Sequence, residues 1–168
     1  RLGFLTSLQK ESLNEALNKF FVKKFKLIKR ALLAVELSSP YAEIDQFSYA
    51  LNEISINRKN TTAMLSIATR IDKEFLTTYW ADGLIIATPT GSTGYSLSSG
   101  GPILTPETAG IVLNPIAPHN LNIRPLVVPD EAEIEIRVDG RGDDHLLSLD
   151  SRIFTIEKGT RIHIKKAP

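Results

Sequence analysis

The sequence predicts a mainly β fold (α+β), an antiparallel β-sandwich with a short helical segment before it. Residues 133–138 alternate between charged and apolar side chains, and residues 161–165 repeat that alternation. This period of two is typical of a strand with one face in water. Strands that follow one another this closely favour an antiparallel sandwich over a doubly wound parallel sheet.

The first forty residues contain the helical part. Leu13, Leu17, Phe20 and Phe21 recur at the spacing of one helix face. Ser7 is suited to cap a helix start. A basic cluster follows, and we interpret it as a solvated face whose long side chains lie over apolar neighbours: Lys19, Lys23, Lys24, Lys26, Lys29 and Arg30.

The remaining residues are predicted to form strands. Before residue 133 the candidates are 31–37, 47–57, 62–72 and 75–80. Between the two alternating strands, residues 139–144 are predicted to form an exposed turn and residues 157–160 a hairpin turn. Prolines mark bends or strand ends, at positions 115, 118, 125 and 129.

Length and composition indicate one globular domain over residues 1–168. The charge of +1 gives no reason to expect binding to nucleic acid or membranes, and no apolar run has membrane-span length. The absence of cysteine excludes disulfides and thiolate chemistry and fits a cytoplasmic location. The three histidines lack the spacing of a zinc site, so no metal site is expected within the chain.

One loop is rich in small hydroxylated residues and glycine. The apolar run at 84–87 leads into Thr88-Pro89-Thr90-Gly91-Ser92-Thr93-Gly94-Tyr95-Ser96-Leu97-Ser98-Ser99-Gly100-Gly101-Pro102-Ile103. Glycine permits close backbone approach, hydroxyls donate and accept, and a tyrosine ring can stack on a base. The alternative is an ordinary strand-to-helix turn. The loop is neither a phosphate-binding P-loop nor a dinucleotide fingerprint.

Four segments, in order along nearly the whole chain, resemble the NAD kinase family. The loop above carries its Thr-Gly-Ser-Thr-Gly-Tyr signature, and Ala50-Leu51-Asn52-Glu53-Ile54 is similar to its Asn-Glu motif. Residues 1–6 resemble the family segment that follows a Gly-Gly-Asp-Gly motif, and residues 115–129 its proline-punctuated segment. Each motif is short, and their collinearity makes the set specific.

The resemblance implies the carboxyl-terminal domain of an NAD kinase. The chain begins at Arg1 and contains no Gly-Gly-Asp-Gly. In the family that motif carries the aspartate regarded as the base, so we expect no catalytic residue in this chain. By this interpretation the chain holds nucleotide but transfers phosphate poorly without its own amino-terminal domain.

The resemblance also implies roles for an adjacent pair. The Asn52 amide would read adenine and the Glu53 carboxylate would accept from the ribose hydroxyls, which suits their donor and acceptor groups. On a regular strand the two side chains would face opposite sides of the sheet. A shared site therefore needs a strand end or a bulge at this pair.

The other nucleotide-binding residues implied by the family lie in and before the loop. Thr93 and Ser98 offer hydroxyls, Tyr95 a stacking ring, and the residues from Thr93 to Ser98 are expected to begin a helix. Asp82 would bind the nicotinamide end of NAD, although an Asp-Gly turn is the common alternative. The expected set is Asp82, Thr90, Thr93, Gly94, Tyr95 and Ser98.

The implied reaction is phosphoryl transfer from ATP or polyphosphate to the 2′-hydroxyl of the adenosine ribose of NAD, giving NADP. A divalent metal ion, expected to be Mg²⁺, would accompany the phosphate donor. NAD and ATP are the expected partners, together with other copies of the chain in a homodimer or homotetramer. Two alternatives stay open: a related lipid or sugar kinase domain, and a non-catalytic nucleotide-binding β-sandwich.

Overall fold

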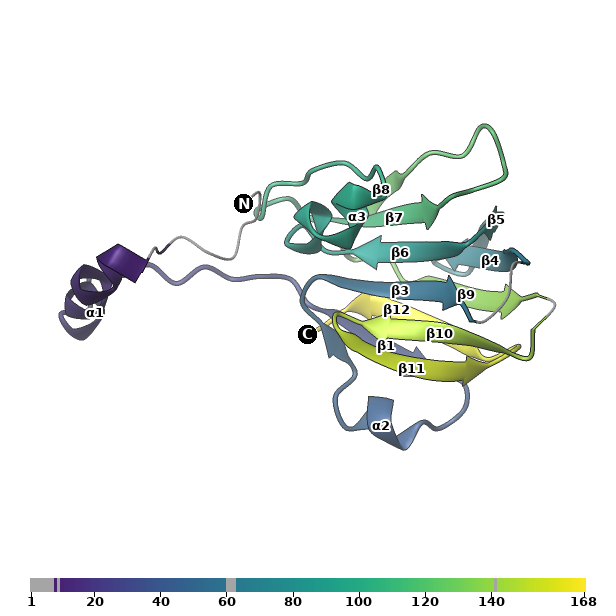
Figure 1. The fold of residues 1–168 in the computed structure, drawn as a ribbon, viewed down its shortest axis with the longest axis horizontal. Coiled ribbons are helices and arrows are strands. Elements are labelled where there is room, and N and C mark those ends of the chain that lie inside the picture. The colour runs from purple at the N-terminus through teal and green to yellow at the C-terminus, as the bar shows by residue number, and fades with distance from the viewer. Residues whose placement is uncertain (1–7, 9, 60–62, 141) are drawn as a thin grey trace.

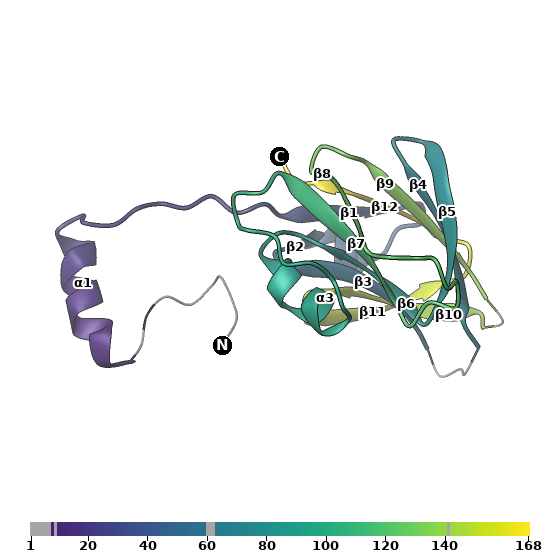
Figure 2. The same ribbon diagram turned by 90° about the horizontal axis from the view of Figure 1, so that it is seen from above.

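The computed structural model describes residues 8, 10–59, 63–140 and 142–168. It shows a sandwich of two β-sheets, with helix α1 held away from it at the end of an extended arm (Figure 1). The view from above shows the same separation (Figure 2). The helices among the described residues are η1 (Lys10–Ser12), α1 (Leu13–Phe21), α2 (Ala42–Asp45), η2 (Gly91–Thr93) and α3 (Tyr95–Ser98).

Strands make up most of the described chain. In chain order they are β1 (Leu33–Leu37), β2 (Tyr49–Ala50), β3 (Glu53–Arg58), β4 (Leu65–Ile71), β5 (Glu74–Ala81), β6 (Gly83–Ala87), β7 (Gly110–Ile116), β8 (Leu126–Pro129), β9 (Ile134–Asp139), β10 (Asp144–Leu149), β11 (Arg152–Glu157) and β12 (Arg161–Lys166).

The strands form two six-stranded sheets in which every neighbouring pair is antiparallel. The first sheet has the order β2-β1-β12-β9-β4-β5, and the second has the order β11-β10-β3-β6-β7-β8. The predicted antiparallel sandwich is therefore confirmed. The two alternating strands, β9 and β12, are neighbours in the first sheet, and their apolar side chains face the other sheet.

The core lies between the two sheets. Ile54 and Ile56 of the second sheet belong to the same buried cluster as Ile67 and Ile136 of the first. A smaller cluster forms on the outer face of the second sheet, where Ile85 packs with Ala87, Val112 and partly buried Leu104. Both faces of β6 are therefore covered, which explains why its sequence is continuously apolar instead of alternating.

The amino-terminal region is less helical than the sequence suggested. Among the described residues of this region, helix is confined to residues 10–21, and residues 24–32 run as an extended arm to β1. Helix α1 has no buried residue, and its apolar side chains, such as Phe20 (58% exposed), are uncovered. Lys19 pairs with Glu15 at 2.6 Å, and residues 23–29 are exposed. The expected cap, Ser7, lies outside the described residues.

Two predicted local features are wrong for one reason. The single strand expected at 47–57 is broken at residues 51–52, because the chain there passes from the first sheet (β2) to the second (β3). The turn at 157–160 is not a hairpin, since β11 and β12 belong to different sheets. Each segment is a passage between sheets, and an alternating pattern does not reveal which sheet a strand joins.

Candidate functional site

The Asn52-Glu53 pair lies where the chain crosses between the sheets. Asn52 stands between β2 and β3, and Glu53 is the first residue of β3. The pair thus sits at a strand end, the condition that a shared site requires. Both residues are partly buried.

A carboxylate from the turn between β10 and β11 holds this crossing in place. Asp150 accepts hydrogen bonds from the backbone N–H groups of Leu51 (2.8 Å), Asn52 (2.7 Å) and Glu53 (3.1 Å). Its own N–H donates to the Glu53 carbonyl at 2.9 Å. Three backbone donors are thus satisfied by one charged acceptor, and such charge-assisted bonds are strong. Sequence reasoning missed Asp150.

The Gly-rich loop packs directly against the same crossing. The Thr88 hydroxyl donates to the Leu51 carbonyl at 2.6 Å, and the Thr88 N–H donates to the Asn52 carbonyl at 2.9 Å. The Thr88 hydroxyl also accepts from the Gly91 N–H at 3.1 Å. A Cβ on Gly91 would lie 2.0 Å from the Asn52 carbonyl oxygen, so this approach requires glycine.

One carboxylate oxygen of Glu53, Oε2, is buried beside the loop without a hydrogen-bond partner among the described residues. A Cβ on Gly94 would come within 3.2 Å of that oxygen, so the loop backbone lies beside it. Burial, and next the negative charge of Asp150, raise the pKa of the Glu53 carboxyl to about 7. The group can accept from a hydroxyl or hold a proton near neutral pH.

The loop presents one aromatic ring to solvent. Tyr95 is 41% exposed and begins α3, a single turn that confirms the helix expected after the loop. The Ser98 hydroxyl donates to the Tyr95 carbonyl at 2.9 Å. The Thr93 hydroxyl donates to the Thr90 carbonyl at 3.3 Å, and Thr90 itself is buried. The Thr93 and Ser98 oxygens keep lone pairs with which to accept.

Three buried polar residues hold the loop from below. The Ser92 hydroxyl donates to the Pro89 carbonyl at 2.7 Å and accepts from the Leu104 N–H at 3.0 Å. The Asn114 amide donates to the Ser96 carbonyl at 2.8 Å, and both residues are fully buried. Part of the loop's polarity is therefore structural, as the alternative of an ordinary turn implied. The sequence did not distinguish these serines from those on the surface.

Asp82 lies at the other end of β6. It directly precedes Gly83, whereas Thr88 and the loop follow Ala87. At the rise of an extended strand, Asp82 and Thr88 are about 20 Å apart. Its carboxylate pairs with Arg58 at 3.2 Å. The structure thus brings together Asn52, Glu53, Gly94 and the loop, but it does not bring Asp82 to them within one chain.

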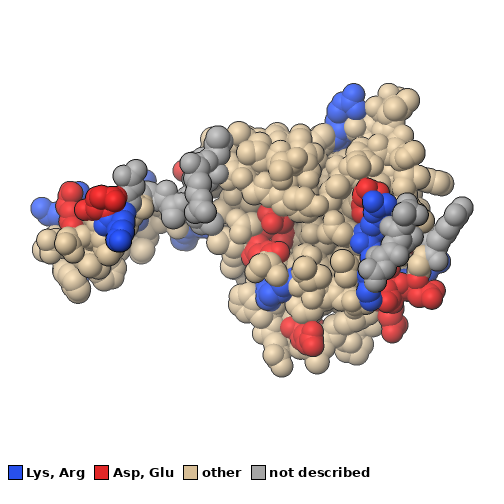
Figure 3. Space-filling model, in the orientation of Figure 1, with Lys and Arg blue, Asp and Glu red and all other residues tan. Residues whose placement is uncertain are grey.

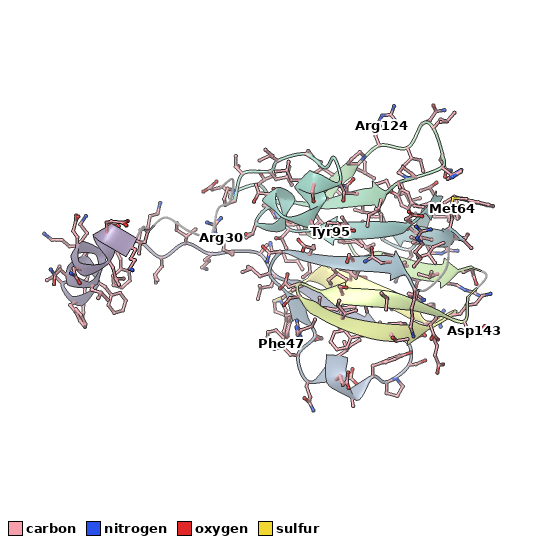
Figure 4. The ribbon with its side chains drawn as sticks, in the orientation of Figure 1. Arg30, Phe47, Met64, Tyr95, Arg124 and Asp143 are labelled. Atoms are coloured by element: carbon pink, nitrogen blue, oxygen red, sulfur yellow. The ribbon has the colours of Figure 1, made fainter. Side chains whose placement is uncertain are left out.

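The histidines do not form a second site. His145 is buried, and desolvation lowers its pKa to about 4, so it is neutral at physiological pH. His119 lines a groove of about 470 Å³ with Met64 and Trp80, near the Asp82 end of the sandwich. Figure 4 marks that end by Met64, well away from Tyr95. Among the described residues, no three histidine or carboxylate side chains are grouped to hold a metal ion.

Charged residues are scattered over the face of the molecule that Figure 3 shows, where lysine, arginine and the acidic residues lie among uncharged ones. None of the helices in the described part of the chain has the length and apolar character needed to span a bilayer. The described residues on the face in Figure 3 therefore form no broad basic surface of the kind that attracts polyanions.

Fold and site together define a β-sandwich domain with a candidate small-molecule site at a crossing between its sheets. A family model for the ATP-NAD kinase C-terminal domain matches residues 51–168. The chain belongs to this family. A Christiangramia forsetii protein named NAD kinase is 54% identical over 100% of this chain, which spans 57% of that protein.

Solved structures agree with this assignment. The crystal structure of yeast NADH kinase complexed with NADH is 32% identical and superposes with a TM-score of 0.88, covering 100% of this chain and 49% of that one. The NAD kinase from Archaeoglobus fulgidus in complex with ATP is 31% identical, with a TM-score of 0.80 over 99% of this chain and 62% of that one. The chain therefore spans 49–62% of these three relatives.

Proposed function

We propose that the protein is an NAD kinase, which transfers a phosphoryl group from ATP or polyphosphate to the 2′-hydroxyl of the adenosine ribose of NAD, giving NADP. The observation that carries this proposal is the Glu53 carboxylate, whose buried Oε2 has no partner among the described residues and lies beside the Gly94 backbone. The NADH in the yeast structure and the name of the C. forsetii protein support the substrate.

In this proposal the crossing and the loop bind the adenosine end of NAD. The Asn52 amide, which offers a donor and an acceptor, reads the adenine edge. Glu53 accepts from the ribose hydroxyls, and such a charge-assisted bond offsets the cost of burying the carboxylate. Tyr95, exposed at the start of α3, stacks on the base.

The remaining loop residues serve approach and orientation. Gly94 lets the ligand reach Glu53 without meeting a side chain. Thr93 and Ser98 accept hydrogen bonds from the adenine amino group, since their protons are already directed to backbone carbonyls. Thr90 is buried, so it contributes its backbone to the loop.

We assign Asp82 to the nicotinamide end of an NAD molecule held by another copy of the chain. Asp82 lies about 20 Å along β6 from the loop, by the strand rise, so one chain does not bring both ends together. A homodimer or homotetramer would complete each site across subunits. The exposed edge strand β5, which carries Trp80 and Phe75 in solvent, offers a surface for such association.

The phosphate donor and its metal are assigned to residues outside this chain. The described residues do not fit a protein-held divalent ion, since they include no suitable group of three ligands. Mg²⁺ is therefore proposed only as a companion of the ATP phosphates. The base is likewise placed elsewhere, because the resemblance assigns it to a Gly-Gly-Asp-Gly motif, which this chain does not contain.

The uncovered helix α1 fits a partner within the complete protein. Leu13, Leu17 and Phe20 form an apolar face that the sandwich does not touch, and they are 44–58% exposed. The C. forsetii relative is longer than the part that this chain matches. We propose that an amino-terminal domain covers this face, and that the complete protein works in the cytoplasm, where ATP and NAD are both available.

Calorimetric titration of the chain with NAD⁺ tests this function. We expect saturable binding that Asn52→Ala and Glu53→Ala each weaken at least tenfold without abolishing it, while thermal melts of all three proteins confirm that they are folded. Protection by diacylglycerol or a free sugar, without protection by NAD⁺, would instead indicate the related lipid or sugar kinases. A folded chain that responds to none of these ligands would contradict the proposed site.

A further inference from the structure

Arg152 makes a concentrated set of contacts beside the candidate site. One guanidinium nitrogen donates to the Phe47 carbonyl at 2.6 Å, and the other donates to the Tyr49 carbonyl. The guanidinium carbon lies 4.6 Å from the centroid of the Phe47 ring. The Phe47 and Tyr49 rings meet edge to face at 5.7 Å. One side chain thus fixes two carbonyls and one aromatic ring.

These contacts complement those of Asp150, which lies two residues earlier in the turn that leads into β11. The Asp150 carboxylate binds the backbone N–H groups of residues 51–53, and the Arg152 guanidinium binds the backbone carbonyls of Phe47 and Tyr49, all within the same short segment, residues 47–53. The β10–β11 turn and the first residue of β11 therefore hold residues 47–53 at two points, about 100 positions away in sequence.

The sheet topology explains why residues 47–53 need these side-chain contacts. β2 is an edge strand of the first sheet and β11 an edge strand of the second. Within the described residues these two strands do not pair, so no backbone ladder joins the sheets along this side. In the view of Figure 4, Tyr95 lies above β3 and Phe47 below it, so the ring that Arg152 contacts is separate from the Tyr95 ring.

We propose that Arg152 is a positioning residue for the Asn52-Glu53 pair. It does not touch the ligand; it fixes the segment that enters the crossing, while Asp150 fixes the crossing itself. Lysine cannot replace it fully, because an ammonium group lacks the planar fork that reaches two carbonyls at once. The ligand-binding part of this proposal rests on the proposed function, and the positioning part does not.

Amide hydrogen exchange of the 168-residue chain tests the positioning directly. In Arg152→Ala we expect exchange at Leu51, Asn52 and Glu53 to accelerate at least tenfold, with the centre of β9 unchanged and Arg152→Lys intermediate. Arg70→Ala is the matched control, because Arg70 also donates to a backbone carbonyl (Lys73, 3.1 Å) but lies in the β4–β5 hairpin. Unchanged exchange at the three amides, or equal acceleration throughout the chain, would overturn the proposal.

A double-mutant cycle then tests the consequence for ligand. Arg152→Ala should weaken NAD⁺ binding about tenfold in the wild-type background and by a clearly smaller factor in an Asn52→Ala background, where only Glu53 is left to be positioned. Both titrations are carried to saturation. Equal losses in both backgrounds would show that Arg152 acts independently of the pair and would overturn the proposal. If the wild-type chain binds no NAD⁺, the proposed function fails, and the exchange experiment alone decides the role of Arg152.

Discussion

The carboxylate of Asp150 accepts a 2.7 Å hydrogen bond from the backbone N–H of Asn52, 98 positions earlier in the sequence. The same carboxylate takes the N–H groups on either side of Asn52. Asp150 has a positive φ of 52°, a conformation that aspartate tolerates better than most residues in a tight turn. The geometry of the candidate site is therefore set from the turn between β10 and β11.

Replacing Asp150 should cost stability and change the neighbouring carboxyl. Asp150→Asn leaves one acceptor oxygen and turns an NH₂ group toward backbone donors, so we expect a loss of about 2–3 kcal/mol in the free energy of unfolding. The pKa of Glu53 should fall, because the charge of Asp150 helps to raise it. Urea denaturation and carbon-detected NMR titration measure the two effects. Asp143→Asn, at an exposed position, should change neither.

Glu53 should make the chain less stable as pH rises. Its carboxyl pKa is about 7 in the folded chain against 4.5 in the unfolded one, so both states are protonated below pH 4.5. Between these values the unfolded chain loses its proton first, and stability falls until it levels off above about pH 7. The full shift is worth about 3 kcal/mol, which partial solvent access reduces to roughly 1–2 kcal/mol.

Urea denaturation at pH 5 and pH 8 measures this dependence, and Glu53→Gln should remove it. Glu36 is a control of opposite sign, because its hydrogen bond with Lys165 lowers the pKa of the Glu36 carboxyl. Glu36→Gln should leave the Glu53 dependence intact. A wild-type chain that gains stability from pH 5 to pH 8 would show that Glu53 is ionised throughout.

Gly91→Ala should separate the loop from the crossing. The new methyl group would lie 2.0 Å from the Asn52 carbonyl oxygen, a backbone atom that cannot rotate away. We expect a loss of about 3 kcal/mol in the free energy of unfolding, together with loss of NAD⁺ binding. Gly140→Ala is the matched control, since its nearest neighbour would be at an ordinary 3.5 Å. Equal melting temperatures for the two variants would contradict the close approach.

Tyr95→Ala should weaken NAD⁺ binding by about 2- to 12-fold, the equivalent of a stacking contribution of about 0.5–1.5 kcal/mol. Tyr95→Phe keeps the ring and should bind nearly as wild type. Lys24→Ala removes an exposed charge on the arm and should have almost no effect. Calorimetric titration compares the four proteins. Similar losses for Tyr95→Ala and Lys24→Ala would rule out stacking as the role of Tyr95.

The sequence predicted best those strands that have one face exposed to solvent. In β9 and β12 the alternation follows directly from burial against the other sheet, so residue type alone located them. The residue pattern did not locate the break at residues 51–52, because the chain there passes between sheets and a carboxylate from a distant turn binds its backbone N–H groups. Nor could local pattern show that residues 157–160 join two sheets instead of two paired strands.

The sequence predicted only part of the candidate site, because some of its contacts join residues far apart in the chain. The resemblance selected Asn52, Glu53 and Tyr95, and the structure places the first two on a crossing against which the loop of the third packs. Asp150 left only a weak signal, an aspartate in a two-residue connection between apolar-alternating strands. Its partners are backbone N–H groups, which every residue except proline carries, so the sequence does not mark them.

The passage from β2 to β3 also constrains how the molecule folds. Strands of the two sheets interleave along the chain, so most pairings join residues far apart, as β1 with β12 does. Such long-range topology folds slowly. The crossing acquires its shape only when β2 has joined the first sheet, β3 has joined the second, and the β10–β11 turn, near the end of the sequence, has packed against them. The nucleotide binding proposed at Asn52 and Glu53 would therefore be a probe of complete folding. A ligand present during refolding would bind only folded molecules and would not accelerate the earlier steps.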